Sequence, residues 1–138
     1  MSKSIDQLIV NNPYFEPTKY WLYNREDQSF ELKNGRRNAG YWKKSDQKLD
    51  ESDFGEFIEI ELVNRIRPRV KKWREENYPN VTPTTKRLLD FWTDKNQREQ
   101  NQNPFFCQME AVETAIWLTE AIESEKQGIK IPSDGSWL

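Results

Sequence analysis

The alternation of apolar and polar residues predicts a β-hairpin in the N-terminal part of the chain. From Lys19 to Trp42 (KYWLYNREDQSFELKNGRRNAGYW) the two kinds of residue alternate, and aromatic residues are frequent. This pattern is typical of strands with one buried face. Asn34-Gly35 is a favoured turn pair, so we expect two short strands in this stretch with that turn. The polar residues 1–20, which include two prolines, are expected to form an arm across a neighbouring surface.

Helical spacing takes over from Phe57 onward. Apolar residues three and four positions apart indicate one buried helix face, namely Leu62, Val63, Ile66, Val70 and Trp73. Pro68 interrupts this pattern, so we expect either a kink or two abutting helices there. The charged segment before it, residues 43–56, is expected to be a loop.

A second helix is predicted after the segment YPNVT. Thr82 suits the N-cap and Pro83 the first helical position. The side expected to be buried consists of Leu88, Leu89 and Trp92. The polar residues that follow are expected to form a linker.

The third predicted helix occupies residues 104–127. Asn103 is a suitable N-cap, Pro104 suits the first turn, and Gly128 suits the C-terminal stop. Because apolar residues also lie off the main stripe, we expect this helix to be buried on more than one side. The main stripe consists of Phe105, Gln108, Met109, Val112, Ala115, Ile116, Thr119 and Ile122.

Together these elements predict an α+β fold. A small N-terminal β-hairpin or sheet would be followed by three or four helices. We expect an N-terminal arm and hairpin region in residues 1–56 and a helical region in residues 57–138.

Composition limits both the core and the chemistry. Only 35% of the residues are hydrophobic and the mean hydropathy is -1.03, although 13% are aromatic. A core is therefore feasible but thin, because a few large side chains must form it. The chain has no histidine and one cysteine, which excludes His-dependent nucleophile pairs and Cys-rich zinc sites. No catalytic residue and no metal ligand is therefore assigned. The absence of a long apolar run predicts no membrane association and a cytoplasmic protein.

A basic segment stands out against a net charge of -2. The segment RIRPRVKKWR holds six basic residues and no acidic one, so its helix would have one apolar and one cationic face. Such a face can neutralise nucleic-acid phosphates, although a solvated helix surface paired with nearby acids is the simpler interpretation. The candidate residues are Arg65, Arg67, Arg69, Lys71, Lys72 and Arg74.

Two other motifs carry little weight. Gly35 and Gly40 have the Walker A spacing, but Tyr41 and Trp42 follow where Lys and Ser or Thr are required. Turn and strand structure is the better interpretation. The segment DESD at 50–53 resembles a DExD box, yet no apolar strand precedes it, so a loop is expected.

Gln108 lies early in the third helix, on its apolar stripe. A buried glutamine there is most often satisfied by backbone groups. Its amide, however, presents a donor beside an acceptor, which matches the N6 and N7 edge of adenine. The surrounding segment, PFFCQMEAVETAIWLTEA, resembles the Q-motif helix of superfamily 2 helicases, and more closely that of DEAD/DEAH-type helicases related to the Res subunit of type III restriction enzymes.

Further stretches resemble the same family in the same order. They are NPYFEPTKYW (12–21), GRRNAGYW (35–42), the segment 62–92 and the tail GIKIPSDG (128–135). The resemblance implies that Gln108 hydrogen-bonds adenine and that Phe105 or Phe106 packs against the base or ribose. The family's lead-in before the glutamine is an Arg-Pro-Tyr type, whereas Phe-Phe-Cys stands here.

The resemblance also implies a limited function. The sequence contains no G-x-x-x-x-G-K-[ST] loop, so this chain alone is not expected to be an enzyme. It would be the N-terminal accessory segment of a helicase or restriction-type ATPase, with the motor domains as partners and DNA as a further partner. ATP binding would be weak or absent in the isolated chain, and Mg²⁺ would require the motor domain.

Two alternatives from other classes remain open. One is a free-standing nucleic-acid-binding or adaptor module that uses the basic helix. The other is a structural or interaction domain without a ligand, in which Gln108 has only a structural role.

Overall fold

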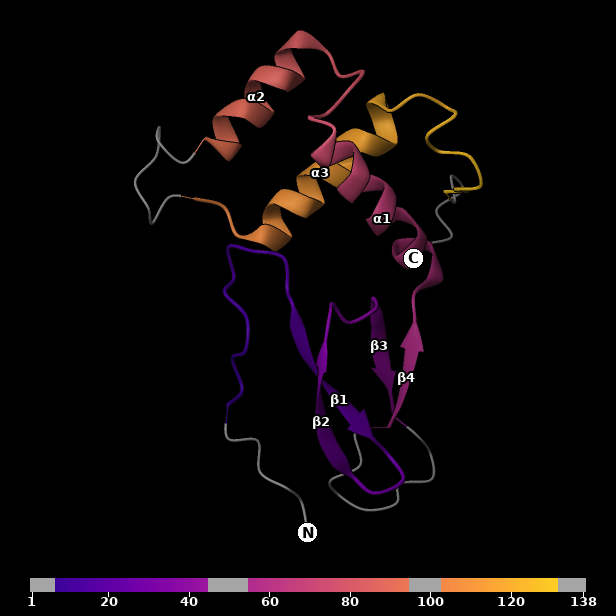
Figure 1. Ribbon diagram of the computed structural model, residues 1–138. Coiled ribbons are helices and arrows are strands. Elements are labelled where there is room, and N and C mark those ends of the chain that lie inside the picture. The colour runs from indigo at the N-terminus through magenta and orange to yellow at the C-terminus, as the bar shows by residue number, and fades with distance from the viewer. Residues whose placement is uncertain (1–6, 45–54, 95–102, 132–138) are drawn as a thin grey trace. The chain divides into compact units, whose positions relative to one another are not determined.

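The first two strands form the predicted antiparallel hairpin. The computed structural model describes residues 7–44, 55–94 and 103–131 (Figure 1). Strand β1 (Lys19–Asn24) pairs with β2 (Ser29–Asn34) in a register that places Tyr23 opposite Phe30. Their rings lie 5.2 Å apart between centroids. This cross-strand aromatic pair stabilises the hairpin.

The turn of this hairpin is not the predicted one. It occupies residues 25–28, whereas Asn34-Gly35 ends β2. Two side chains fix the observed turn, because Asn24 Oδ1 accepts from the amide of Glu26 and Asp27 Oδ1 accepts from the amide of Ser29. Gly35, at φ 96°, instead begins the connection towards the next strand.

A second two-stranded antiparallel sheet was not predicted. Strand β3 (Gly40–Lys43) pairs with β4 (Glu56–Glu59), so Phe57 lies in a strand and the expectation of helix from that residue is wrong. A Cβ on Gly40 would lie 2.4 Å from the carbonyl oxygen of Ile58. The spacing Gly35–Gly40 therefore reflects a turn and a close strand pair, as expected, and not a phosphate loop.

The structure confirms the α+β class. Three α-helices follow the sheets within the described residues: α1 (Glu61–Glu75), α2 (Pro83–Thr93) and α3 (Phe106–Glu120). Pro68 lies inside α1 without dividing it, so the expectation of two abutting helices is wrong. The buried residues of α1 are Ile66, Val70 and Trp73, which belong to the predicted face.

Helix α2 begins as predicted. Thr82 is its N-cap, with the side-chain oxygen accepting from the amide of Thr85 at 3.2 Å, and Pro83 occupies the first turn. Of the predicted buried side only Leu89 is fully buried, while Leu88 is exposed. Glu120 of α3 accepts from the amide of Thr82 and from the hydroxyl of Thr85, which ties the start of α2 to the end of α3.

Helix α3 is shorter than predicted and buries a different face. Phe105, not Asn103, is its N-cap, and it ends at Glu120, well before Gly128. Glu113, Trp117 and the C-cap residue Ala121 are buried, whereas most of the predicted stripe is exposed. The helix is apolar nearly all round, so the apolar pattern alone did not determine which side is covered. Polar contacts to Glu113 decide it, as described below.

The described residues belong to two units, an N-terminal unit (residues 1–64) and a C-terminal unit (residues 65–138). In the N-terminal unit the arm returns to its own hairpin, since Asn11 Oδ1 accepts from the amides of Thr18 and Lys19. The DESD segment, most of the predicted loop 43–56, most of the polar linker after α2 and the end of the tail lie outside the described residues. None of the helices in the described residues is long and apolar enough to cross a membrane.

Candidate functional site

Gln108 occupies the first turn of α3 and holds the start of the helix. Its Oε1 accepts from the backbone amide of Phe105 at 2.9 Å. Phe105 is the N-cap, and its side chain has no acceptor to offer the first-turn amides, so only this half of a capping box exists. Gln108 is exposed, which corrects the expectation that it is a buried glutamine.

The two phenylalanines before Gln108 have different environments. Phe105 is 42% exposed. Phe106 is half-buried, and the Arg74 guanidinium carbon lies 5.3 Å from its ring centroid, a cation–π contact. Phe105 is therefore the ring that remains accessible beside Gln108, while Phe106 packs within the C-terminal unit.

The basic segment is largely used inside the C-terminal unit. Arg67 Nε lies 3.9 Å from a carboxylate oxygen of Glu110 on α3. Arg69 donates to the carbonyls of Glu125 and Gln127, in the segment that follows α3. These two residues, chosen from the sequence as phosphate contacts, connect α1 to α3 and to the segment that follows it.

Arg74 belongs to a buried polar cluster with Glu113 and Tyr78. Arg74 Nε and the Tyr78 hydroxyl each donate to Glu113 Oε2 at 2.7 Å, and Glu113 is 1% exposed. Burial opposes the charge of Arg74, but the hydrogen bond and charge of Glu113 raise its pKa overall. Burial, and then the bond to Glu113, raise the pKa of Tyr78 well above its usual range.

The remaining basic residues are more accessible. Arg65, Lys71 and Lys72 are exposed, and Lys72 Nζ lies 3.8 Å from the carboxylate of Glu76 one turn later. The six predicted basic residues therefore do not form one outward cationic face. Three of them stabilise the unit from within.

The N-terminal unit contains a cavity of about 300 Å³ that was not predicted. Its walls come from β1, the connection after β2, β3 and β4, and they combine aromatic with arginine side chains. The sequence signal was present, because arginines are interleaved with the aromatic residues of 19–42. That stretch was interpreted only as strand and turn.

Comparison with known proteins identified no relative of this chain. No family model, no curated protein and no solved structure matches the chain. The described segments 7–44, 55–94 and 103–131 also contain no group of three acidic or cysteine side chains placed to hold a metal ion.

Proposed function

We propose that this chain is the N-terminal accessory segment of a superfamily 2 helicase related to the Res subunit of type III restriction enzymes. In this role Gln108 supplies adenine recognition to an ATP site completed by the motor domains. The chain contributes no phosphate cradle of its own, since its sequence contains no G-x-x-x-x-G-K-[ST] loop.

The observation that carries this proposal is the position of the Gln108 amide. Its carboxamide is exposed at the N-terminal end of α3, next to an accessible aromatic ring, Phe105. The hydrogen bond from the Phe105 amide restrains the carboxamide at 2.9 Å. Restraining a recognition group before the ligand arrives lowers the entropy cost of binding.

The chemistry of the amide suits adenine. Oε1 has two lone pairs, of which the Phe105 amide uses one. The second lone pair accepts from the N6 amino group, while Nε2 donates to N7. Guanine presents an acceptor, O6, in place of the amino group, so the same amide discriminates ATP from GTP.

The exposed side of α3 supports a role within a larger assembly. Phe105, Val112 and Ile122 are among the large apolar residues that remain exposed along and just after this helix. Large apolar residues exposed on one element favour an interaction site there over a fully solvated helix. In this proposal the motor domains cover it.

The alternative of a nucleic-acid-binding module on the basic helix has less support. Arg67, Arg69 and Arg74 contact acidic or carbonyl groups within their own unit. Neutralising phosphates with them would break contacts that hold α1, α3 and the following segment together.

Saturation-transfer NMR on the full chain with ATP or GTP tests the proposal. We expect transfer to the adenine protons of ATP at a dissociation constant of about 1 mM, near -4 kcal/mol, because base contacts alone are available. GTP should give markedly weaker transfer to its base. Transfer from GTP that equals or exceeds the transfer from ATP would overturn the proposal.

Gln108→Glu is the informative variant. A glutamate retains an oxygen for the Phe105 amide, so the helix start is preserved, but it has no N–H to donate to adenine N7. We therefore expect unchanged helicity and loss of the ATP preference. Gln127→Glu, at another exposed glutamine of the C-terminal unit, makes the same charge change and should leave the preference intact.

A further inference from the structure

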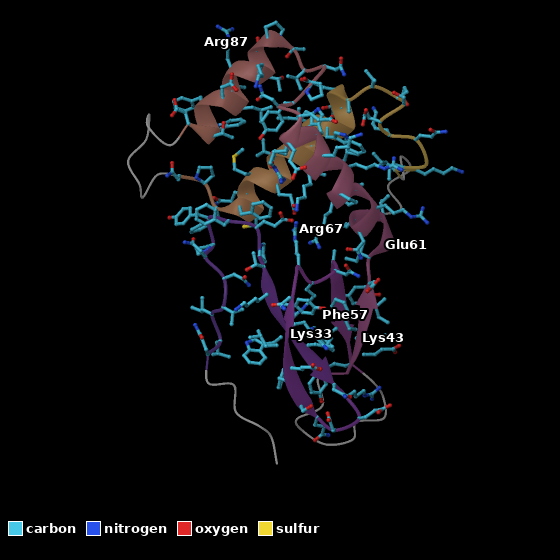
Figure 2. All side chains as sticks on the ribbon, in the orientation of Figure 1. Lys33, Lys43, Phe57, Glu61, Arg67 and Arg87 are labelled. Atoms are coloured by element: carbon cyan, nitrogen blue, oxygen red, sulfur yellow. The ribbon has the colours of Figure 1, made fainter. Side chains whose placement is uncertain are left out.

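The cavity of the N-terminal unit lies where its two small sheets meet. β1 contributes Tyr20 and Tyr23, β3 contributes Trp42, and β4 contributes Phe57, which is labelled in Figure 2. The Tyr23 and Trp42 rings meet edge to face at 5.9 Å, and the Trp42 and Phe57 rings lie 5.1 Å apart. An isolated two-stranded hairpin is only marginally stable, so these ring contacts also hold the unit together.

The cavity is accessible from outside. Trp42 is 38% exposed although it packs on two other rings, and Tyr20 is half-buried. A volume of about 300 Å³ lies at the small end of the range for ligand sites. A ligand with one aromatic ring and a small polar substituent fits this volume better than a ligand with several bulky groups.

Three arginines line the same space. Arg25 follows β1, and Arg36 and Arg37 lie between β2 and β3. Arg37 donates to the carbonyl of Trp21, and its guanidinium carbon lies 5.6 Å from the Tyr20 ring centroid. These contacts fix its position, and a guanidinium keeps its charge whatever it donates to.

Acidic residues partly offset this charge and restrict the ligand. Glu56 and Glu59 also line the cavity, and Glu59 accepts from the side-chain amide of Asn38 at 2.9 Å. Arg36 lies 3.8 Å from Glu16. The lining itself carries three arginines against two glutamates, a net charge of +1 that Glu16 further offsets at Arg36, so it suits one phosphodiester charge beside an aromatic ring.

We propose that this cavity binds one nucleotide unit of a single-stranded nucleic acid. The base stacks on the exposed ring of Trp42, and the adjoining phosphate lies near Arg37. Base stacking on aromatic residues together with arginine contact is the usual chemistry of sequence-tolerant single-strand binding. The proposal is independent of Gln108 and moves the expected nucleic-acid contact from the basic helix to the other unit.

A duplex does not suit the cavity. Stacking on Trp42 requires an unpaired base that can leave its neighbours, and paired bases in a double helix are already stacked. Preference for single strands is therefore part of the proposal.

The test is a titration of the full, ¹⁵N-labelled chain with an oligothymidylate, followed through the tryptophan indole N–H signals. Thymine avoids the adenine-specific contact proposed for Gln108, so the two proposals fail separately. We expect the Trp42 signal, assigned through Trp42→Phe, to shift. Trp73 and Trp117, buried in the C-terminal unit, should stay in place. The dissociation constant should be about 10⁻⁴ M, as for non-specific binding.

A charge-matched pair of variants tests the phosphate contact. Arg37→Gln should weaken oligothymidylate binding several-fold and reduce the slope of log K against log salt by about 0.7, the value for one phosphate on a single strand. Arg87, which is exposed on α2 and labelled in Figure 2, is the control, and Arg87→Gln should leave both quantities unchanged.

Three results would overturn the proposal. They are a Trp42 signal that does not respond to oligothymidylate, a duplex that binds as tightly as the single strand, and thymidine monophosphate that binds as tightly as the oligonucleotide. The last would indicate a free-nucleotide site. The Trp42 response is measured on the unmodified protein, so it decides the question even if Arg37→Gln fails to fold.

Discussion

Arg74 on α1 donates from Nε to Oε2 of Glu113 on α3 at 2.7 Å, across 39 positions of the chain. The same carboxylate oxygen accepts from Tyr78, and the side chain of Glu113 is 2% exposed against 24% for Arg74. A buried carboxylate is tolerated only when it is paired and hydrogen-bonded. This pair therefore selects the face of α3 that turns inward.

Replacing Glu113 should destabilise the protein strongly. Glu113→Ala leaves the buried Arg74 charge without its partner, and breaking such a pair costs about 3 kcal/mol, the lower end of the usual range because Arg74 keeps some solvent contact. Urea unfolding followed by tryptophan fluorescence measures the loss. Glu76→Ala, at an exposed pair with Lys72, is the control and should change stability by at most about 0.5 kcal/mol. Similar losses for both variants would contradict the assigned role.

Tyr78 should make stability fall at alkaline pH. Its pKa is raised in the folded chain above the ordinary value of 10.0, so the folded state keeps the proton while the unfolded chain releases it. The stabilisation is complete below pH 10 and is lost progressively as the pH rises above that value. Urea midpoints across this range measure the effect, and Tyr78→Phe should remove it. The ultraviolet absorbance of tyrosinate gives an independent check. Titration of all five tyrosines at their ordinary pKa would contradict the raised pKa of Tyr78.

The sequence predicted the positions of the helices and of the first hairpin better than it predicted the turns and the contacts between elements. Thr82-Pro83 located the start of α2, because a capping hydroxyl and a proline act within one turn. The alternating pattern also predicted the hairpin, but the turn was placed at Asn34-Gly35. The observed turn is held by the side chains of Asn24 and Asp27, which accept from backbone amides. This signal is less distinctive in a sequence than an Asn-Gly pair. β4 was missed because a short strand has no periodicity to distinguish it from the start of a helix.

The candidate sites were harder to predict because they depend on contacts distant in sequence. Arg69 has the composition of a phosphate contact, yet it donates to the carbonyls of Glu125 and Gln127. Gln108 was expected to be buried because it lies on an apolar stripe, but that stripe is the exposed one. The cavity near Trp42 joins four segments, and no local pattern indicates which segments meet.

The apolar residues exposed on α3 and just after it should bind an apolar dye. Val112 is 36% and Ile122 is 46% exposed, so the chain should increase anilinonaphthalene sulfonate fluorescence while folded. Ile122→Lys should reduce the dye signal with a stability change within about 0.5 kcal/mol. Trp117→Ala, at a fully buried position, should instead cost about 3–5 kcal/mol. A folded chain that binds no dye would contradict the exposure of this face.

The cap of α2 offers a local test of the fold. Thr82→Ala removes the acceptor for the Thr85 amide and should cost about 1 kcal/mol. Thr84→Ala, at an exposed position in the same turn, is the matched control and should be nearly neutral. Thermal unfolding followed by circular dichroism compares the two. Equal melting temperatures would contradict the assigned cap.

The most direct test of the adenine-recognition proposal follows the side-chain amide protons of Gln108 during nucleotide titration. The signals are assigned through Gln108→Glu, in which they disappear. The account predicts that ATP shifts these signals, because Nε2 donates to adenine N7, and that GTP at the same concentration shifts them much less. A response of these signals to GTP that equals or exceeds their response to ATP would contradict the proposal that Gln108 recognises adenine.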